Sequence, residues 1–383
     1  MLYPRSCLLL AIGMLTLVGC SGSTEPTGAG GTGEGGGPGG AASGQGGETF
    51  GVGGGGGENG MVEPISAPNE EWTWIPFDDA FCANGTTTGI GANLTDKSST
   101  VVIYLMGGGA CWDNLTCYIA NTAVNIASGY GETNFAQDSK YLSGSLFNRT
   151  NSQNPLRNAS YFFVPYCTGD VHAGNNPDAV YDGQPTKHVG FKNIESYLKR
   201  IAATFPNADR VILSGSSAGG FGAGLNLWQA QKAFGSVRVD LVDDSGPPLP
   251  SPYLSETLEG QWRAAWNLSA TLPENCAECQ TDLSGIFGFY SQQLPNSRVA
   301  LLSYTHDQVI ADYFFIPTDK VAEGLGVLAA ELDGYANTRY YFAAGSDHVL
   351  LGTPETISQN GVPLFDWLTK MVTDDPAWAN VKP

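Results

Sequence analysis

The stretch Val211-Ile212-Leu213-Ser214-Gly215-Ser216-Ser217-Ala218-Gly219-Gly220 decides the fold of this 383-residue chain. It joins a short apolar run to a helical stretch from about Ala218 to Ala233 through the pattern G-x-S-x-G. A sharp turn leaves no room for side chains beside the serine, and the two glycines after it let the helix pack closely on the strand. In a chain rich in glycine and serine, a turn that caps an ordinary helix could also match this pattern. The position between strand and helix favours a nucleophile turn with Ser217 as the reactive residue.

The sequence around this turn alternates between strand and helix patterns. Strands are expected at 101–106, 161–165, 211–213, 237–242, 299–304 and 340–344, and helices at 193–205 and 363–372 besides the one after Ser217. Pro206-Asn207 ends the first of these helices. Short, fully apolar strands separated by helices predict a mostly parallel central sheet with helices on both faces. With the serine turn, this predicts an α/β-hydrolase fold, in which the irregular segments 110–158 and 247–297 are insertions that carry cysteines.

Three consecutive glycines, Gly107 to Gly109, directly follow the strand expected at 101–106. Glycines after an early strand can present backbone N–H groups to a developing oxyanion. Alone, the run favours a simple tight turn. Upstream of a nucleophile turn, it predicts an oxyanion hole formed by the N–H groups of Gly107, Gly108 and Ala218.

A serine nucleophile needs a base, and the four histidines are His172, His188, His306 and His348. In α/β-hydrolases the chain order is serine, acid, histidine, so only the last two qualify. His348 lies in the loop after the strand 340–344, where the base is expected. His306 as the base would leave no acid-bearing strand between it and Ser217.

Asp307 follows the strand 299–304, which is where this fold carries its acid. The alternatives to it are Asp243, Asp244, Asp347 and Asp312. We therefore expect Ser217 as nucleophile, His348 as base and Asp307 as the residue that orients the base. Activity should fall at acid pH, because a protonated imidazole cannot accept the serine proton.

Several segments resemble the pectin acetylesterase and Notum family of carboxylesterases. The resemblance covers roughly residues 70–370 and is carried by Leu105-Met106-Gly107-Gly108-Gly109-Ala110-Cys111-Trp112 with Cys117, Val164-Pro165-Tyr166-Cys167-Thr168-Gly169-Asp170, Gly215 to Gly220, and Asp244-Ser245-Gly246. Asp307 and His348 stand where the family has its acid and base. The D-S-G turn of the family is a further reason against Asp244 as the acid.

The resemblance implies removal of small acyl groups from a polysaccharide, or of a fatty acyl group from a protein. The chain departs from the family at Ala110, where or beside which relatives have an aromatic residue, and Trp112 is expected to fill part of that volume. The cysteine that precedes the family's histidine is also missing before His348. Both departures lie near the acyl pocket.

Composition restricts the partners. The formal net charge is -19, although only 14% of residues are charged. Such a chain should repel nucleic acid and anionic membrane surfaces, and a neutral acetylated glycan such as xylan is a more natural ligand than polygalacturonate. No cofactor is expected, and we expect a monomer.

The N-terminus resembles a bacterial lipoprotein signal. Arg5 is followed by an apolar run from Leu8 to Val18 and by Leu17-Val18-Gly19-Cys20. The expected organisation is a signal peptide at 1–19, a lipidated Cys20 with a glycine-rich flexible linker over 20–65, and a catalytic domain at 66–383. An ordinary signal peptide with an incidental cysteine is the alternative. Ser21 favours the outer membrane, so we expect an exported protein anchored to a bacterial surface by its lipid alone.

Six cysteines remain after Cys7 and Cys20 are set aside, an even number that predicts disulfides in an exported protein. The natural local pairs are Cys111–Cys117 and Cys276–Cys279, which leaves Cys82 with Cys167. The Cys276-x-x-Cys279 pair is also compatible with half of a zinc site, but no second pair or histidine cluster accompanies it, and we expect no metal.

Together these features predict an exported serine esterase that removes small acyl groups, acetyl foremost, from a polysaccharide or related ester through an acyl-enzyme. A lipid or protein deacylase, a serine peptidase on the same fold and a non-catalytic surface-binding protein are the alternatives.

Overall fold

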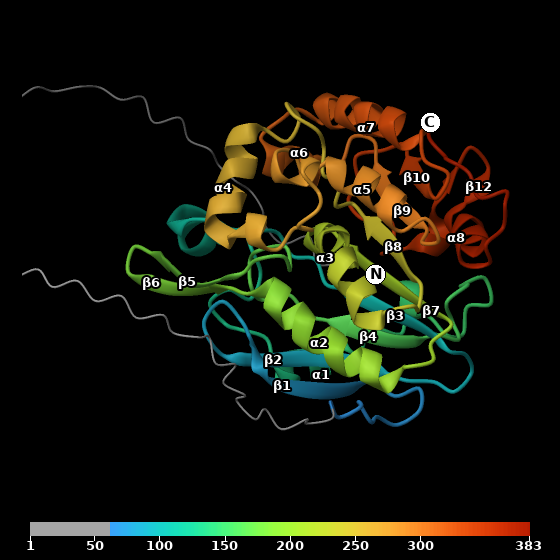
Figure 1. The fold of residues 1–383 in the computed structure, drawn as a ribbon, viewed down its shortest axis with the longest axis horizontal. Coiled ribbons are helices and arrows are strands. Elements are labelled where there is room, and N and C mark those ends of the chain that lie inside the picture. The colour runs from blue at the N-terminus through green and yellow to red at the C-terminus, as the bar shows by residue number, and fades with distance from the viewer. Residues whose placement is uncertain (1–61) are drawn as a thin grey trace, which may run out of the picture. The chain divides into compact units, whose positions relative to one another are not determined.

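An eight-stranded sheet runs through residues 62–383, the part of the chain that the computed structural model describes (Figure 1). The predicted signal peptide, Cys20 and all but the end of the predicted linker lie outside these residues. The strand order is β1-β2-β4-β3-β7-β8-β9-β10. Its strands are β1 (Thr73–Phe81), β2 (Thr87–Asn93), β3 (Thr100–Leu105), β4 (Ser160–Val164), β7 (Arg210–Ser216), β8 (Val239–Asp244), β9 (Val299–Tyr304) and β10 (Thr338–Ala343).

Strands β4, β3, β7, β8, β9 and β10 are parallel to one another, as the apolar runs predict. The first two strands, β1 and β2, pair antiparallel with each other, and β2 pairs antiparallel with β4. The predicted α/β fold with a mostly parallel sheet is therefore confirmed. Because parallel strands end at the same edge, the loops after β3, β7, β9 and β10 meet there.

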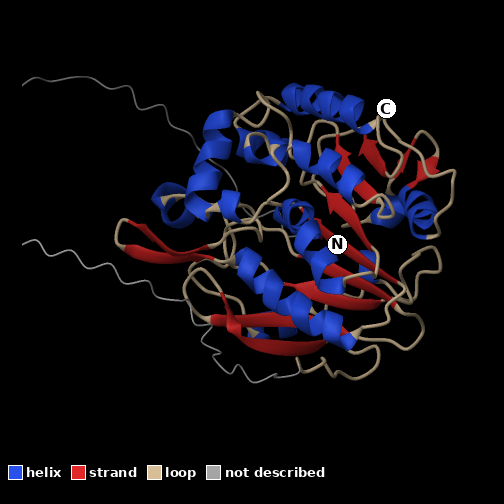
Figure 2. Cartoon of the chain, in the orientation of Figure 1, coloured by secondary structure: helices blue, strands red, loops and turns tan. Residues whose placement is uncertain are grey.

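The helices cover both faces of the sheet (Figure 2). They are α1 (Glu132–Asp138), α2 (Gly190–Thr204), α3 (Ala218–Phe234), α4 (Glu256–Trp266), α5 (Gly285–Gln293), α6 (Gln308–Phe314), α7 (Thr318–Leu332) and α8 (Leu364–Val372). Alternation along a strand decides which face each side chain joins. Ile103 belongs to the apolar core that includes residues of α2, α3, α5 and α7, whereas its neighbour Val102 belongs to the core that includes residues of α8. Each face therefore has its own apolar core.

Two small hairpins lie outside the main sheet. They are β5 (Asn176–Tyr181) with β6 (Gln184–His188), and β11 (Ser358–Gln359) with β12 (Val362–Pro363). In Figure 1, hairpin β5–β6 projects beside α4, which belongs to the segment expected to be an irregular insertion. The Asn176 side chain donates to the carbonyl of Ala265 at 2.8 Å, so hairpin and helix are joined. Within residues 62–383, no helix has the length and apolarity needed to cross a bilayer.

Candidate active site

Ser217 lies at the turn between β7 and α3, with φ 59° and ψ -124°. This is a sparsely populated backbone conformation for a residue with a side chain, and such strain costs about 1–3 kcal/mol. The backbone N–H of Ser217 donates to the carbonyl of Asp244 at 2.8 Å, which fixes the turn against β8. The turn is thus held in the sharp geometry that exposes a nucleophile at the end of a strand.

Glycine is required on both sides of this serine. A Cβ on Gly215 would collide with the carbonyl of Gly219, and a Cβ on Gly219 would collide with the carbonyl of Leu105. A Cβ on Gly220 would enter the space of the Asp243 carboxylate. The G-x-S-x-G-G pattern is therefore explained by close packing of α3 on the strands and not by the turn alone.

Asp307 and His348 meet at the same edge of the sheet. The Nδ1 atom of His348 lies 2.7 Å from Oδ2 of Asp307. Asp307 is fully buried, and its other oxygen accepts from the backbone N–H groups of Val309 and Ile310, where it caps helix α6. The carboxylate is therefore held by three donors, with one oxygen aimed at the imidazole.

The opposite nitrogen of this imidazole, Nε2, is buried and has no hydrogen-bond partner among residues 62–383. Ser217 follows β7 and His348 follows β10, so both residues come to the same edge of the parallel strands. No hydrogen bond between the two side chains is present in this part of the chain. Hydrogen bonds of this kind are often long in free enzymes and shorten when substrate binds.

The alternative acids have other partners. Asp243 accepts from the N–H of Gly246 at 2.9 Å, and burial raises the pKa of its carboxyl well above the usual range. Asp312 accepts from the side chain of Gln308. His306, the alternative base, bonds to Thr305 and lies 3.5 Å from Asp319. Of the candidate acids, only Asp307 bonds to His348.

Asp244 contacts the loop of the histidine but not its ring. Its two oxygens accept from the N–H groups of Leu350 and Leu351 at 2.8 and 2.9 Å, and from the hydroxyl of Ser216 at 2.6 Å. Burial raises the pKa of Asp244, and these three hydrogen bonds oppose that rise. This carboxylate links the residue before Ser217 to the loop that carries His348, a role that sequence reasoning did not find.

The glycine run packs against the serine turn. A Cβ on Gly107 would lie 3.0 Å from the Cβ of Ser217, and the positive φ of Gly108 (146°) and Gly109 (81°) is one that other residues rarely adopt. Within residues 62–383, the N–H groups of Gly107 and Gly108 have no acceptor. Ala218 begins α3, where backbone N–H groups also lack intrahelical partners.

His172 is bonded to the residue that precedes this glycine run. Chain order did not suggest this role, because His172 comes before Ser217 in the chain. Its Nε2 lies 2.8 Å from the carbonyl of Met106, the residue before Gly107. Burial lowers the pKa of His172 to about 4, although its bond to Met106 and the charge of Asp170 oppose the shift. The ring is therefore neutral near pH 7 and can donate its Nε2 proton to Met106.

A small apolar cavity opens beside Ser217. Its volume is about 20 Å³, and its walls include Ala110, Phe221, Trp262, Ile310 and Phe314. Phe221, Trp262 and Phe314 contact one another with ring centroids 6.0 to 6.2 Å apart. Relatives were expected to carry an aromatic residue at or beside Ala110. In this chain, aromatic side chains from α3, α4 and α6 line the cavity that Ala110 faces.

Three disulfides join the six cysteines of the described domain: Cys82–Cys167, Cys111–Cys117 and Cys276–Cys279. The second closes the loop directly after the glycine run. Together with His188, Cys111 and Cys117 also form a cluster with metal-like spacing. Both sulfurs are already bonded to each other, so neither is a thiolate ligand.

A mostly parallel sheet with a serine turn after one strand and a histidine–aspartate pair after two others is the arrangement of α/β-hydrolases. Comparison with known sequences then gives the family. The model of the family described as Pectinacetylesterase matches residues 75–322, and the chain belongs to this family of carboxylic ester hydrolases. The matched region includes Ser217 and Asp307 and ends before His348.

Named relatives agree with this assignment. The chain is 30% identical over 216 residues to palmitoleoyl-protein carboxylesterase notum2 of Xenopus laevis, covering 51% of this chain and 43% of the relative. It is 29% identical over 174 residues to notum1a of Danio rerio, covering 43% of this chain and 33% of the relative. The match therefore spans less than half the length of either relative.

The crystal structure of the Wnt deacylase Notum from Drosophila has the same fold. The two structures align with a TM-score of 0.60 and 18% sequence identity, covering 82% of this chain and 96% of that one. At this identity the likeness concerns the fold.

Proposed function

We propose that the chain is an exported serine esterase that removes acetyl groups from a polysaccharide, with Ser217, His348 and Asp307 as its catalytic residues. The observation that carries the proposal is the 2.7 Å contact between His348 and the fully buried Asp307, with the opposite imidazole nitrogen unpartnered at the edge where Ser217 lies. Family membership supplies the ester hydrolase chemistry.

The reaction follows from these positions. His348 Nε2 accepts the hydroxyl proton of Ser217 as Oγ attacks the ester carbonyl, and Asp307 stabilises the imidazolium that forms. The tetrahedral intermediate collapses, the imidazolium protonates the alcohol that leaves, and an acetyl-enzyme remains. Water, deprotonated by the same imidazole, then releases acetate and restores the serine.

Negative charge on the carbonyl oxygen needs donors that are already in place. The N–H groups of Gly107, Gly108 and Ala218 are assigned this role, because the glycine run packs on the serine turn and two of its donors have no protein acceptor within residues 62–383. One such donor is worth about 3 kcal/mol of barrier. The bond from His172 to Met106 holds the strand end that presents this run.

The size of the cavity favours acetyl over longer acyl groups. The cavity beside Ser217 is small, about 20 Å³, and is walled by large aromatic side chains, so a short acyl group fits it better than a long one. The palmitoleoyl group in the names of the Notum relatives would need this wall to open. Deacylation of a lipid-modified protein is therefore the second candidate function, supported by the relatives and opposed by the cavity.

The location of the enzyme rests on residues outside the described part. The lipoprotein-like sequence before Cys20, the glycine-rich stretch to residue 65 and the catalytic domain at 66–383 support an enzyme tethered by its lipid to the bacterial surface. Three disulfides in the domain suit an oxidising compartment. The acidic surface favours a neutral acetylated glycan over polygalacturonate.

Ester chain length provides the direct test. The purified protein should hydrolyse p-nitrophenyl acetate with a kcat/KM roughly 100-fold above that for p-nitrophenyl octanoate, because each misfitting methylene costs a factor of about 10 or more until the chain escapes the cavity. Preference for octanoate would contradict the acetyl assignment and support the lipid or protein deacylase. Equal turnover of acetylated xylan and acetylated pectin at low salt would remove the argument from charge.

A further inference from the structure

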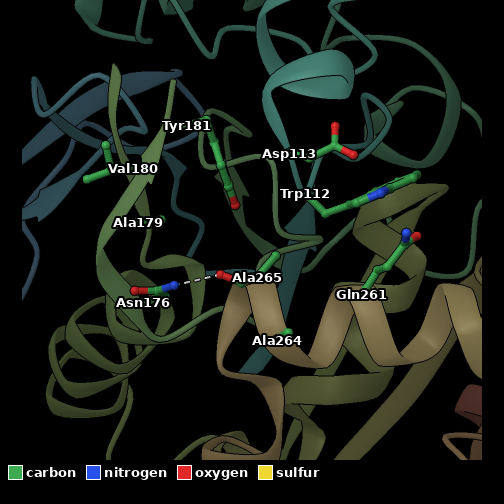
Figure 3. Close-up of a pocket in the computed structure, with 9 residues that line it drawn as sticks. All are labelled: Trp112, Asp113, Asn176, Ala179, Val180, Tyr181, Gln261, Ala264 and Ala265. Carbon is green, nitrogen blue, oxygen red and sulfur yellow. Dashed lines mark hydrogen bonds between the residues drawn. The ribbon is translucent and has the colours of Figure 1, made fainter. Parts of the chain in front are cut away.

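A second hollow, with a volume of about 440 Å³, lies on the surface, and Figure 3 shows the residues that line it. Three elements form it: hairpin β5–β6, the loop after the glycine run and helix α4. Trp112 and Tyr181 contribute aromatic rings, Asp113, Asn176 and Gln261 contribute polar groups, and Ala264 lies on the helix below them. Its volume is within the range of about 300–1,000 Å³ that ligand sites occupy. The mechanism proposed above makes no use of this groove.

This groove shares a wall with the small apolar cavity beside Ser217, which we call the acetyl cavity. The rings of Trp112 and Trp262 have centroids 6.1 Å apart; Trp112 lines the groove and Trp262 lines the cavity. Gln261 and Trp262 are consecutive on α4 and line the two hollows separately. Likewise, Ala110 lines the cavity and Trp112, two residues later, lines the groove. The wall that Trp112 and Trp262 form therefore separates a ligand in the groove from an acyl group held at Ser217.

The polar groups of the groove are placed to bind a ligand with many hydroxyls. One oxygen of Asp113 caps the turn at Thr116, and its other oxygen has no partner among residues 62–383. The Gln261 amide likewise has no partner in this part of the chain and is exposed, whereas Asn176 uses its amide nitrogen to hold Ala265. Each of the three can therefore still accept, and Gln261 can also donate.

The rings and the charge narrow the ligand further. Tyr181 is half-buried, and its hydroxyl lies 2.9 Å from Nε2 of His188, so its ring is positioned before a ligand arrives. Trp112 is 8% exposed at the shared wall, so Tyr181 offers a ligand the more accessible ring. Rigid aromatic rings pack well against the apolar faces of sugar rings. None of the residues that the structure places around the groove is cationic, and Asp113 gives it an anionic side. A polyanionic chain would therefore be repelled.

From these contacts we infer that the groove is a binding subsite for a neutral polysaccharide, which holds the sugar units next to the acetylated one. This inference rests on the proposed esterase function and adds to it the site at which the neutral chain that carries the ester is bound. The subsite raises the affinity for a polymer and makes no contribution to the hydrolysis of a small ester.

The test fills the groove without touching the acetyl cavity. Ala264→Trp places a large side chain in the groove from the exposed face of α4, and Ala330→Trp on the exposed face of α7 is the matched control. Each variant is assayed on p-nitrophenyl acetate and on acetylated xylan. We expect Ala264→Trp to raise KM for acetylated xylan roughly tenfold, with kcat/KM for p-nitrophenyl acetate within about twofold of wild type. Ala330→Trp should change neither.

Binding of xylohexaose, which carries no ester, separates this inference from the proposed function. Titration followed by tryptophan fluorescence should show saturable binding of xylohexaose to the unaltered protein, even if the protein hydrolyses no ester. Ala264→Trp should remove this binding, and polygalacturonate should not compete with it. Unchanged xylohexaose binding in Ala264→Trp would overturn the subsite. Two other results for Ala264→Trp would also overturn the subsite. One is a KM that rises only for an O-acetylserine peptide, which would indicate a groove for peptides. The other is an equal loss of kcat/KM on p-nitrophenyl acetate.

Discussion

Asp244 connects the two loops that carry Ser217 and His348. It accepts from Ser216, directly before Ser217, and from Leu350 and Leu351, two and three residues after His348. The strained φ of Ser217 (59°) and Val349 (65°) lies beside these contacts. A single buried carboxylate thus holds the loops of Ser217 and His348 in fixed positions relative to each other, although it bonds to neither Ser217 Oγ nor His348 Nε2.

Replacing this carboxylate by an amide should misplace His348. In Asp244→Asn, only one side-chain oxygen can still accept, so one of the two backbone N–H groups loses its partner at a cost of about 1–3 kcal/mol. We expect kcat for p-nitrophenyl acetate to fall by roughly 10-fold or more with KM little changed. The substitution would displace the loop that carries His348 and would leave the acyl cavity intact.

The matched control is Asp347→Asn, an exposed carboxyl on the same loop. It should keep wild-type kcat and thermal stability. Normal kcat in Asp244→Asn with a lowered melting temperature would show that Asp244 serves the fold alone.

The order of serine, acid and histidine along the chain, together with the strands they follow, was enough to select the three candidate catalytic residues. Asp307 and His348 follow the two strands where this fold places its acid and base, and the structure brings the pair within 2.7 Å. The roles of Asp244 and His172 could not be found in this way. Both form hydrogen bonds, most of them to backbone groups, with segments far away in sequence, and such contacts have no signature in residue type or spacing.

Helix α6 serves two parts of the site. Its first turn is capped by Asp307, and its inner face supplies Ile310 and Phe314 to the acetyl cavity. The helix that Asp307 caps therefore also forms part of the wall of the cavity beside Ser217.

Shortening the last of these side chains should lengthen the preferred ester. Phe314→Ala removes a ring from the cavity wall, and we expect the ratio of kcat/KM for p-nitrophenyl butyrate over acetate to rise by roughly 10-fold. The loss of a buried ring should also cost about 3–5 kcal/mol of stability.

Phe289→Ala on α5 controls for that loss, because Phe289 is buried in the same core without lining the cavity. It should lower the melting temperature and leave the ester preference unchanged. An unchanged preference in Phe314→Ala would show that this wall does not limit the acyl group.

The elements that sequence patterns located best are the buried ones. The strand expected at 299–304 has the observed bounds, and the helix after Ser217 ends within one residue of its expected end. Strands β1 and β2 were not predicted. The first carries half-exposed and charged residues and the second is rich in glycine and threonine, so neither is a continuous apolar run. The segment 247–297, expected to be irregular, contains α4 and α5.

Two buried histidines should make the folded domain sensitive to acid. Burial lowers the pKa of His172 to about 4 and also lowers that of His188. Between the ordinary histidine value of about 6.5 and the folded value, the unfolded chain binds more protons, so stability falls as pH falls through this window. For His172 the full effect is about 3 kcal/mol.

His172→Gln should reduce this acid sensitivity, because glutamine does not titrate and can still donate to Met106. Chemical denaturation at pH 7 and pH 4.5 measures it. The loss of unfolding free energy between the two pH values should be smaller in the variant than in the wild type by about 2 kcal/mol. An equal loss in both proteins would contradict the burial of a neutral imidazole at this position.

The location of the molecule depends on one cysteine outside the described residues. If Cys20 is the lipidated first residue of the mature protein, Cys20→Ala should abolish incorporation of labelled palmitate. Less of the protein should also be found in the membrane fraction, because the acyl chains on Cys20 would be its attachment to the bilayer. Unchanged labelling would mean that the lipid is attached elsewhere.

The central claim is that Ser217 is a nucleophile activated by His348. The most direct measurement is intact-mass spectrometry with peptide mapping after exposure to a fluorophosphonate. We predict one adduct, located on Ser217, that is absent in Ser217→Ala and forms at least roughly 1,000-fold more slowly in His348→Ala. No adduct on the folded wild-type protein, or an adduct on Ser217 that forms as fast without His348, would contradict this account.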